Sequence, residues 1–336
     1  MPSASEMELK RLKELTGRVG SDPLLTQAST GNSSAKLDGK LWIKASGRWM
    51  ADALRDDIFI ALDHGHVVDC LEHGRDPSET FQRASLETAM HAALPQRFVL
   101  HVHSVDAIAW AVRQDAVAQL EPRLDGLCWR WIPYAASGLP LANAIREEVS
   151  RDNNANVFVL ANHGLVVAAD EVSELWKLLR DVSRRLAIRA RTTHPADYAV
   201  LARMCEDSVW EIPDDDDVHA LGTDSVCRKI LSGGLLYPCQ AMLRGAADGL
   251  FQPVASAGAK CADRPFLIVD RFGVLINRSV RPAELAMLSG AAQVLRRLSA
   301  PAPIRYLTAD EIAGISCPVA QRYMEFANAS YESVGA

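Results

Sequence analysis

The sequence predicts an α/β domain followed by a small α+β domain. Through roughly the first 210 residues, short apolar runs with strand character alternate with segments of helical periodicity, a pattern in which helices cover a sheet. A proline and four consecutive aspartates then interrupt this alternation in EIPDDDDVHALGTD, residues 211–224. Adjacent carboxylates repel one another and stay solvated, so this segment predicts a linker. We place the boundary near residue 212, which gives domains 1–212 and 213–336.

The elements of the first domain follow from the spacing of its apolar residues. Charges interleaved with leucines in residues 1–20 indicate an amphipathic helix and not a signal peptide. Four apolar runs predict strands: KLWIKAS (40–46), DIFIALD (57–63), RFVLHVHS (97–104) and ANVFVLANHGLVVAA (155–169). Two segments show helical periodicity: ASLETAMHAAL (84–94) and EVSELWKLLRDVSRRLAIRARTT (171–193).

The second domain has fewer elements. Residues 264–280, RPFLIVDRFGVLINRSV, predict two strands around an Arg-Phe-Gly turn. Residues 282–298 and 308–331 predict helices. The domain has no clustered acid/base pair, and its role stays unassigned. If it were the functional part of the chain, the first domain would be structural.

Composition narrows the possible functions. The 336 residues are 49% hydrophobic, enough for one large core or two modest ones. A net charge of −6 argues against a nucleic-acid binder, and no apolar run reaches the roughly 18–20 residues that span a bilayer. Seven scattered cysteines without a C-x-x-C indicate reduced thiols, so we expect a cytoplasmic protein. Because of its charge and its short apolar runs, we expect it to contact neither nucleic acid nor membrane.

Two histidines lie in a strand that is otherwise apolar. Residues i and i+2 of a strand point to the same face, so His101 and His103 project side by side. Two imidazoles at this separation can reach one Zn²⁺, whereas two buried imidazoles without a partner are costly. We therefore interpret this pair as metal ligands and not as core histidines.

A second His-x-His pair occurs in DHGH, residues 63–66. Here a glycine separates His64 from His66, and an aspartate precedes them. The pattern is typical of a hairpin turn whose side chains point to water. We expect no metal at this pair.

Further ligands are needed for a complete metal site. His163 ends an apolar run just before a glycine that lets the chain turn sharply. Glu87 lies where a helix is expected to begin, and His91 follows one turn later. Each of the three is a candidate ligand, although a glutamate at a helix start can also serve as a cap.

Several stretches, in this order, resemble the class II aldolase/adducin family, which includes fuculose-phosphate and rhamnulose-phosphate aldolases. They are STGNSSAK (29–36), LWIKASG (41–47), SLETAMHAAL to VLHVHS (85–104), IPYAASG (132–138) and LANHGLVV (160–167). Within this family, the chain is most similar to the aldolase part of bifunctional aldolase/short-chain dehydrogenase proteins. Three segments carry this likeness: SDPLL (21–25), LWIKASG (41–47) and RYLTADEIA (305–313). No G-x-G-x-x-G follows a strand, so we expect no nicotinamide site.

The resemblance implies a fold, a cofactor and a ligand set. The fold is a three-layer α/β/α domain with a mixed, largely antiparallel central sheet. Zn²⁺, or another divalent metal, is bound by Glu87, His101, His103 and His163, while His91 lies on a helix behind the site. Such a mixed set can open a coordination position for substrate.

The implied reaction is retro-aldol cleavage of a small ketose, ketose phosphate or sugar acid. A metal-stabilised enediolate forms, and Glu87 acts as general acid/base. The substrate's anionic group is bound by glycine turns and hydroxyls, which here are Ser29, Gly31, Asn32, Ser46, Gly47 and Ser85. The family's active sites form at subunit borders, so a homo-oligomer, with a tetramer favoured, is implied.

Two features differ from the family pattern. One of two serines before the glutamate is Leu86 here, which favours an unphosphorylated or oxidised substrate such as a sugar acid. Residues 112–131 contain no tyrosine, whereas family aldolases have one in this segment, so the group that protonates the leaving aldehyde is unidentified. Epimerisation, decarboxylation and a non-catalytic adducin-like role therefore stay open as alternatives.

Overall fold

The computed structural model describes residues 2–81, 83–254, 263–315 and 325–329. The chain forms two compact units. The first, here called the sheet unit, comprises Met1–Ala111, Ala116–Ala187 and Glu325–Ala336; the second unit comprises Val112–Asp115 and Ile188–Met324. Each is described separately.

The sheet unit is built on a seven-stranded mixed sheet with the order β3-β2-β1-β4-β7-β6-β5. Neighbouring strands are antiparallel except for β5 and β6, which are parallel. This agrees with the predicted mixed, largely antiparallel sheet. The strands are β1 (Asn32–Leu37), β2 (Lys40–Lys44), β3 (Phe59–Asp63), β4 (Phe98–Val102), β5 (Trp129–Ile132), β6 (Val157–Leu160) and β7 (Gly164–Ala169).

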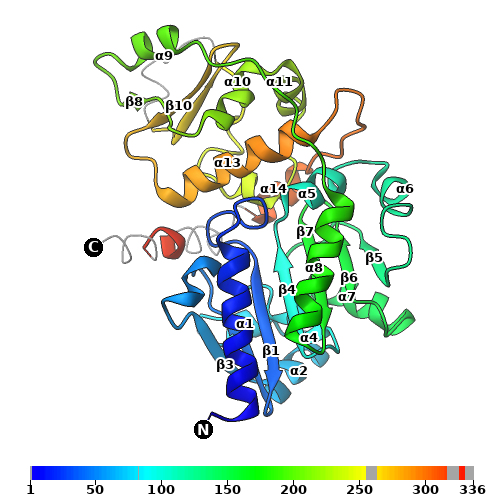
Figure 1. The fold of residues 1–336 in the computed structure, drawn as a ribbon. Coiled ribbons are helices and arrows are strands. Elements are labelled where there is room, and N and C mark those ends of the chain that lie inside the picture. Colours follow the sequence, from blue (N-terminus) through cyan, green and yellow to red (C-terminus); the bar gives the residue numbers. More distant parts are fainter. Residues whose placement is uncertain (1, 82, 255–262, 316–324, 330–336) are drawn as a thin grey trace. The chain divides into compact units, whose positions relative to one another are not determined.

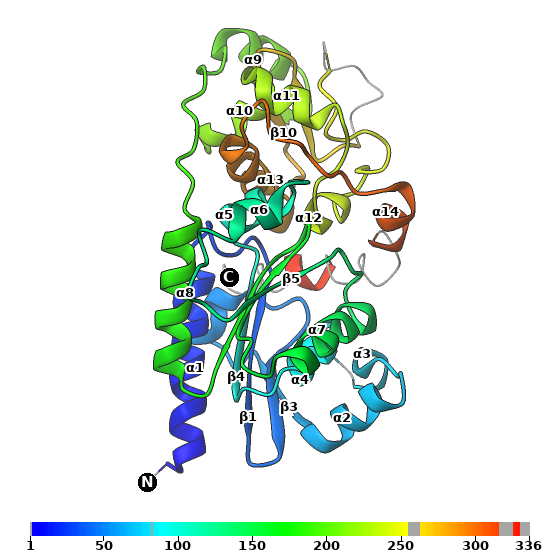
Figure 2. The ribbon, with the colours of Figure 1, turned by 90° about the vertical axis from the view of Figure 1, so that its right-hand side faces the viewer.

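Helices cover both faces of this sheet, which makes the predicted three layers (Figure 2). On one side α1 and α8 lie against the sheet, and on the other lie α2, α4 and α7. The helical segments are α1 (Ala4–Gly20), η1 (Met50–Leu54), α2 (His64–Glu72), α3 (Pro77–Thr80), α4 (Thr88–Ala93), α5 (Val105–Ala111), α6 (Ala116–Leu120), α7 (Leu139–Arg151) and α8 (Val172–Leu186).

The two largest apolar cores of the sheet unit lie between its layers. Leu12 and Val19 of α1 join Leu175 and Leu179 of α8 in the larger core, together with alternate residues of β4. The smaller core contains residues of α4 and α7 and the opposite face of the same strands. A strand buried on both faces shows a continuous apolar run, which explains why β4 and β7 are so hydrophobic.

The DHGH segment is not the hairpin turn that the sequence predicts. It begins α2, because the Asp63 carboxylate accepts a hydrogen bond from the His66 backbone N–H at 3.0 Å and caps the helix. His66 is exposed and His64 is half-buried. Asp63 lies three residues before a backbone N–H that has no partner within the helix, which is an N-cap pattern. The glycine between the two histidines does not prevent the helix from starting there.

The second unit contains a three-stranded antiparallel sheet of order β8-β10-β9 (Figure 1). Strands β9 and β10 form the predicted hairpin, with Arg271 of the turn at φ 67°. Of the helix predicted for residues 308–331, α14 covers the start, residues 316–324 lie outside the described part, and residues 325–329 are helical. The elements are α9 (Tyr198–Cys205), β8 (Trp210–Glu211), η2 (Asp216–His219), α10 (Ala220–Thr223), α11 (Ser225–Leu231), α12 (Pro238–Ala241), β9 (Phe266–Val269), β10 (Gly273–Asn277), α13 (Pro282–Arg297) and α14 (Ala309–Ile315).

The division between the units differs from the boundary placed near residue 212. It falls directly after α8, and the acidic run lies inside the second unit. Three of the four carboxylates of this run have partners there: Asp215 caps η2, Asp216 accepts from the Tyr198 hydroxyl, and Asp217 accepts from Gln293. Partners distant in sequence therefore hold a segment that composition alone suggests is a solvated linker.

A membrane-spanning segment is not evident in the described part of the chain, where each helix is too short or too polar to cross a bilayer.

Candidate metal centre

His101 in β4 and His103 just after it share one face of the strand. Phe98, Leu100 and Val102 belong to the core beneath α1 and α8, whereas Val99 belongs to the core beneath α4 and α7. His101 therefore points to the α4 side, as the two-residue period of a strand requires. His103 follows at the same spacing, just beyond the end of β4.

Glu87, His101, His103 and His163 converge from three parts of the sheet unit. One ligand atom from each lies within 4.8 Å of the others. Glu87 Oε1 lies 3.3 Å from His101 Nε2 and 3.2 Å from His163 Nε2, and the Nε2 atoms of His101 and His103 are 3.1 Å apart. The structure thus brings together the four residues that the sequence analysis names as metal ligands.

A tight reversal between β6 and β7 delivers His163. Asn162 adopts φ 51°, a left-handed conformation that asparagine tolerates better than most residues. A Cβ on Gly164 would lie 2.6 Å from the Val102 carbonyl oxygen and 3.3 Å from Cε1 of His101. Glycine is therefore required where the chain passes the strand that holds the other histidines.

Burial sets the protonation of the cluster. Desolvation lowers the pKa of His103 well below its ordinary value, aided by the neighbouring His101 and His163. Desolvation also lowers the pKa of His163, against the opposing effect of Glu87. Burial alone would raise the pKa of Glu87, but the adjacent His101 and His163 outweigh it and hold the pKa well below the ordinary value. The site therefore disfavours the protonated forms of His103 and His163 and favours an ionised Glu87.

This arrangement fits a divalent cation. His101 Nδ1 lies 3.1 Å from the Leu165 carbonyl oxygen, which only accepts, so Nδ1 carries a proton and Nε2 is the ring atom turned toward the other ligands. Nε2 of His101 lies 3.3 Å from the Glu87 carboxylate and 3.1 Å from Nε2 of His103. A cation among them would make each contact attractive. Three imidazoles and one carboxylate are also a donor set that Zn²⁺ accepts.

Glu87 is free for this role because it does not cap its helix through its side chain. It precedes α4, and its carboxylate makes no capping hydrogen bond. Its Oε2 instead accepts from Asn32 Nδ2 at 2.7 Å. The hydroxyl of Ser85 accepts from the Glu87 backbone N–H and from the same Asn32 amide, both at 3.2 Å. Two of the predicted substrate-binding residues thus support a predicted metal ligand.

The other predicted substrate-binding residues lie in two turns. Gly31 and Gly47 both adopt φ 72°, as expected of glycine turns. A Cβ on Gly31 would lie 2.8 Å from the His101 carbonyl oxygen, so the first turn packs against the strand of the metal ligands. Ser29 is fully buried, and its hydroxyl has no hydrogen-bond partner among the residues that the structure describes. Ser46 begins the second turn, where its backbone N–H donates to the Arg83 carbonyl at 3.0 Å.

Lys44 joins these two turns and was not identified as a site residue from the sequence. Its ammonium donates to the carbonyl oxygens of Ser29 at 3.1 Å, Ala45 at 3.3 Å and Arg48 at 2.6 Å. The side chain is almost completely buried, and burial lowers its pKa from 10.5 to about 7, an effect that the Glu87 charge opposes. The sequence does contain a signal for this role, namely a lysine within the largely apolar strand segment LWIKASG.

The DHGH histidines are not part of the cluster. Among the described residues, the group that could hold a metal comprises only the four named above. His66 packs its ring edge-on against Phe81, with centroids 5.1 Å apart. His91, in contrast, is fully buried behind the site, as predicted.

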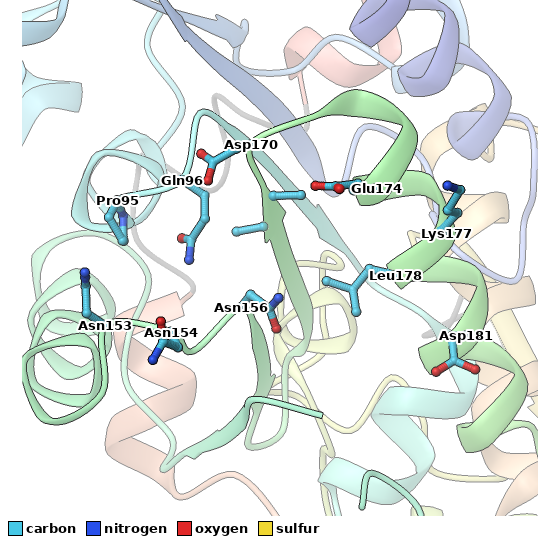
Figure 3. A pocket seen from close by; sticks show the side chains of 12 residues that line it. Pro95, Gln96, Asn153, Asn154, Asn156, Asp170, Glu174, Lys177, Leu178 and Asp181 are labelled. Carbon is cyan, nitrogen blue, oxygen red and sulfur yellow. The ribbon is translucent and has the colours of Figure 1, made fainter. Parts of the chain in front are cut away.

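A polar groove of about 760 Å³ lies elsewhere on the sheet unit (Figure 3). Gln96, Asn156 and Asp170 line it, at the starts of β4 and β6 and the end of β7. In the register of β4 and β7, Phe98 pairs with Ala169 and His101 pairs with Val166. The groove is therefore at the opposite ends of these strands from the metal ligands, and no predicted site residue lines it.

Comparisons with known proteins identify similar sequences and structures. A model of the class II aldolase and adducin N-terminal domain matches residues 16–189. An uncharacterized oxidoreductase, YuxG, of Bacillus subtilis (strain 168) is 32% identical over an alignment of 182 residues that covers 47% of this chain and 26% of the relative. The chain thus spans about a quarter of the length of that curated relative.

Solved structures with a similar fold include two class II aldolase proteins. The N-terminal class II aldolase domain of a conserved protein from Thermoplasma acidophilum is 21% identical, with a TM-score of 0.46, covering 55% of this chain and 93% of that one. The L-fuculose-1-phosphate aldolase of Thermus thermophilus is 21% identical, with a TM-score of 0.36, covering 52% and 92%. The family model covers just over half of the 336 residues, and this chain belongs to the class II aldolase and adducin family.

Proposed function

We propose that the sheet unit is a zinc-dependent aldolase that cleaves a carbon–carbon bond of a small ketose, ketose phosphate or sugar acid. The observation that supports this most directly is the convergence of one carboxylate and three imidazoles within 4.8 Å. Another divalent metal in the same site would serve the same chemistry. When bound, the metal supplies a Lewis acid that stabilises negative charge on the substrate oxygens next to the cleaved bond.

The chain's own residues would hold the metal and move a proton. His101, His103 and His163 would be permanent ligands, because each is buried. Glu87 differs, since one of its oxygens faces two imidazoles while the other accepts from the Asn32 amide. Because Asn32 also binds this carboxylate, Glu87 can move away from the imidazoles and still be held next to the site. We assign to it the proton transfer of a general acid/base.

The glycine turns would bind an anionic group of the substrate. Backbone N–H groups of such turns and nearby hydroxyls suit a phosphate or a carboxylate. The buried Ser29 hydroxyl has no protein partner to satisfy it. Lys44 links both turns through its amino group, which donates to carbonyl oxygens in each of them. Because Leu86 replaces a serine, we favour a sugar acid over a ketose phosphate.

Decarboxylation is the second candidate, and a specific observation favours it. Residues 112–131 contain no tyrosine to protonate a leaving aldehyde. Carbon dioxide leaves without needing a proton, so a decarboxylase would not require that residue. Epimerisation on the same scaffold would likewise proceed through a stabilised enolate.

Metal content and product formation test the proposal. The purified chain should hold about one divalent ion, and H101A should lose it. A panel of phosphorylated and unphosphorylated ketoses and sugar acids is then offered to the zinc-loaded protein. Aldehyde release is followed with an alcohol dehydrogenase and NADH, and carbon dioxide release is measured in parallel.

H66A is the matched control, because His66 lies in the other His-x-His pair and outside the cluster. It should keep both metal and activity. Aldehyde release supports the aldolase, whereas carbon dioxide release alone supports the decarboxylase. A chain that binds no divalent ion and behaves as H101A does would be a non-catalytic adducin-like module. Mass measurement in solution tests our accompanying proposal, from the resemblance, of a homo-oligomer and in particular a tetramer.

A further inference from the structure

A chain of buried hydrogen bonds runs behind the candidate metal centre. His91 Nδ1 lies 2.7 Å from the Ser34 hydroxyl, and His91 Nε2 contacts Asn32 Oδ1. The Asn32 amide nitrogen reaches the Ser85 hydroxyl and Glu87 Oε2. These five residues are each at most 9% exposed, so their contacts are largely shielded from water.

The chemistry of the groups fixes the direction of the bonds that Asn32 makes. An ionised Glu87 only accepts, so the amide nitrogen of Asn32 must face it. The amide oxygen then faces His91 and needs a donor, so His91 holds its proton on Nε2. Its Nδ1 lies 2.7 Å from the Ser34 hydroxyl, which anchors the other side of the ring.

The contact that matters is the one between His91 and the Asn32 oxygen. An asparagine amide can rotate by half a turn at little cost in shape, which exchanges its oxygen and nitrogen. A rotated Asn32 would point its oxygen at Glu87 and repel it. A donor fixed on His91 makes that rotation unfavourable, because it would leave two N–H groups facing each other.

We propose that His91 is a positioning residue that locks the amide of Asn32 and, through it, the carboxylate of Glu87 toward the metal. The inference rests on the proposed function, since it takes Glu87 as a metal ligand. It changes the role of Asn32 from a substrate contact to a support of the metal site. It also explains why a polar ring is buried on the α4 face that packs against the sheet.

The test is a double-mutant cycle read out as metal affinity. The zinc dissociation constant is measured by chelator competition, without substrate, for wild type, H91F, N32A and the double variant. Partners of a metal ligand typically contribute about 10–100-fold to affinity. We expect H91F to weaken binding by about that factor, and N32A by a similar factor. In the N32A background, H91F should cause little further loss, since the group through which it acts is gone.

H91Q is the conservative variant, because a glutamine amide can donate to the Asn32 oxygen. It should recover zinc affinity to within about threefold of wild type, whereas H91F should not. If H91F fails to fold, S34A provides the same test more gently: the loss of the hydroxyl should weaken zinc binding a few-fold in wild type and not in N32A.

The outcomes separate this inference from the proposed function. If wild type binds zinc but the effects of H91F and N32A multiply, His91 acts by packing alone and the inference is wrong. Equal losses in H91F and H91Q would also overturn it. If wild type binds no divalent metal at all, the proposed function fails and this inference fails with it.

Discussion

Replacement of Lys44 by methionine should change how the stability of the sheet unit depends on pH. Methionine keeps the length and the apolar stem of lysine but removes the ammonium. Burial lowers the pKa of Lys44 from 10.5 to about 7, with Glu87 opposing the shift. Below the folded pKa the lysine is protonated in both states, and the folded state bears the full cost of the buried charge. As pH rises above about 7, the folded protein releases the proton before the unfolded chain does, so stability increases.

The size of this increase follows from the two pKa values. Between pH 7 and pH 9 the unfolded chain stays almost fully protonated at this position, while the folded protein goes from half to almost fully deprotonated. Integration at about 1.4 kcal/mol per pKa unit gives a gain of about 2 kcal/mol in the free energy of unfolding. If the folded pKa differs by one unit either way, the gain is about 1–3 kcal/mol.

Urea unfolding at pH 7 and pH 9 in a chelator checks the value. The free energy of unfolding of wild type minus that of K44M should be about 2 kcal/mol larger at pH 9. Lys36, whose pKa burial also lowers to about 7, titrates in both proteins and cancels. K40M is the control, because Lys40 is an exposed lysine of the same strand; its difference from wild type should not vary. The same difference at both pH values for K44M would refute the reasoning, since Lys44 would then keep its charge in the folded state.

Three further predictions concern the turns and the metal. G31A should destabilise the sheet unit by about 1–3 kcal/mol and weaken zinc binding, because Gly31 has φ 72° and a Cβ would lie 2.8 Å from the His101 carbonyl oxygen. Thermal unfolding measures the first effect and zinc titration the second, and an unchanged zinc affinity would contradict the prediction. G47A should displace the helical turn 325–329, because its Cβ would lie 2.3 Å from Cβ of Phe326. The amide hydrogens of that segment should then exchange faster, and unchanged exchange rates would show that the contact is absent in solution. Removal of metal with a chelator should lower the unfolding temperature. Zinc at about 1,000 times its dissociation constant should then raise the free energy of unfolding by about 4 kcal/mol, whereas magnesium at the same concentration should not raise it.

The sequence was most informative where side-chain periodicity is short-range. The alternation along β4 was enough to place His101 and His103 on one face, because a strand's period is set by its own backbone. The glycine after His163 marked the reversal that brings the third imidazole back. These features do not depend on which element packs opposite.

Features that depend on distant partners were not predicted. Strand β1, with the sequence NSSAKL, has little apolar character and was not identified as a strand, yet β2 and β4 pair with it on both sides. Thr16 of α1 and Ser33 share a hydrogen bond at 2.6 Å across the larger core. Such buried polar pairs favour a strand only when the whole sheet is present. The acidic run was misinterpreted for the same reason.

The placement of Asn32 shows how the fold couples the two halves of the site. In the register of β1 and β4, Asn32 lies directly opposite His101, so a single strand pair sets an amide beside a metal ligand. Gly31 precedes it and packs its turn against the backbone of the same histidine. The turn proposed to bind the substrate's anion and the residue that supports Glu87 are therefore neighbours on one strand end. A shift of this turn when an anion binds would move Asn32, and the position of Glu87 would respond to the substrate before any bond is broken.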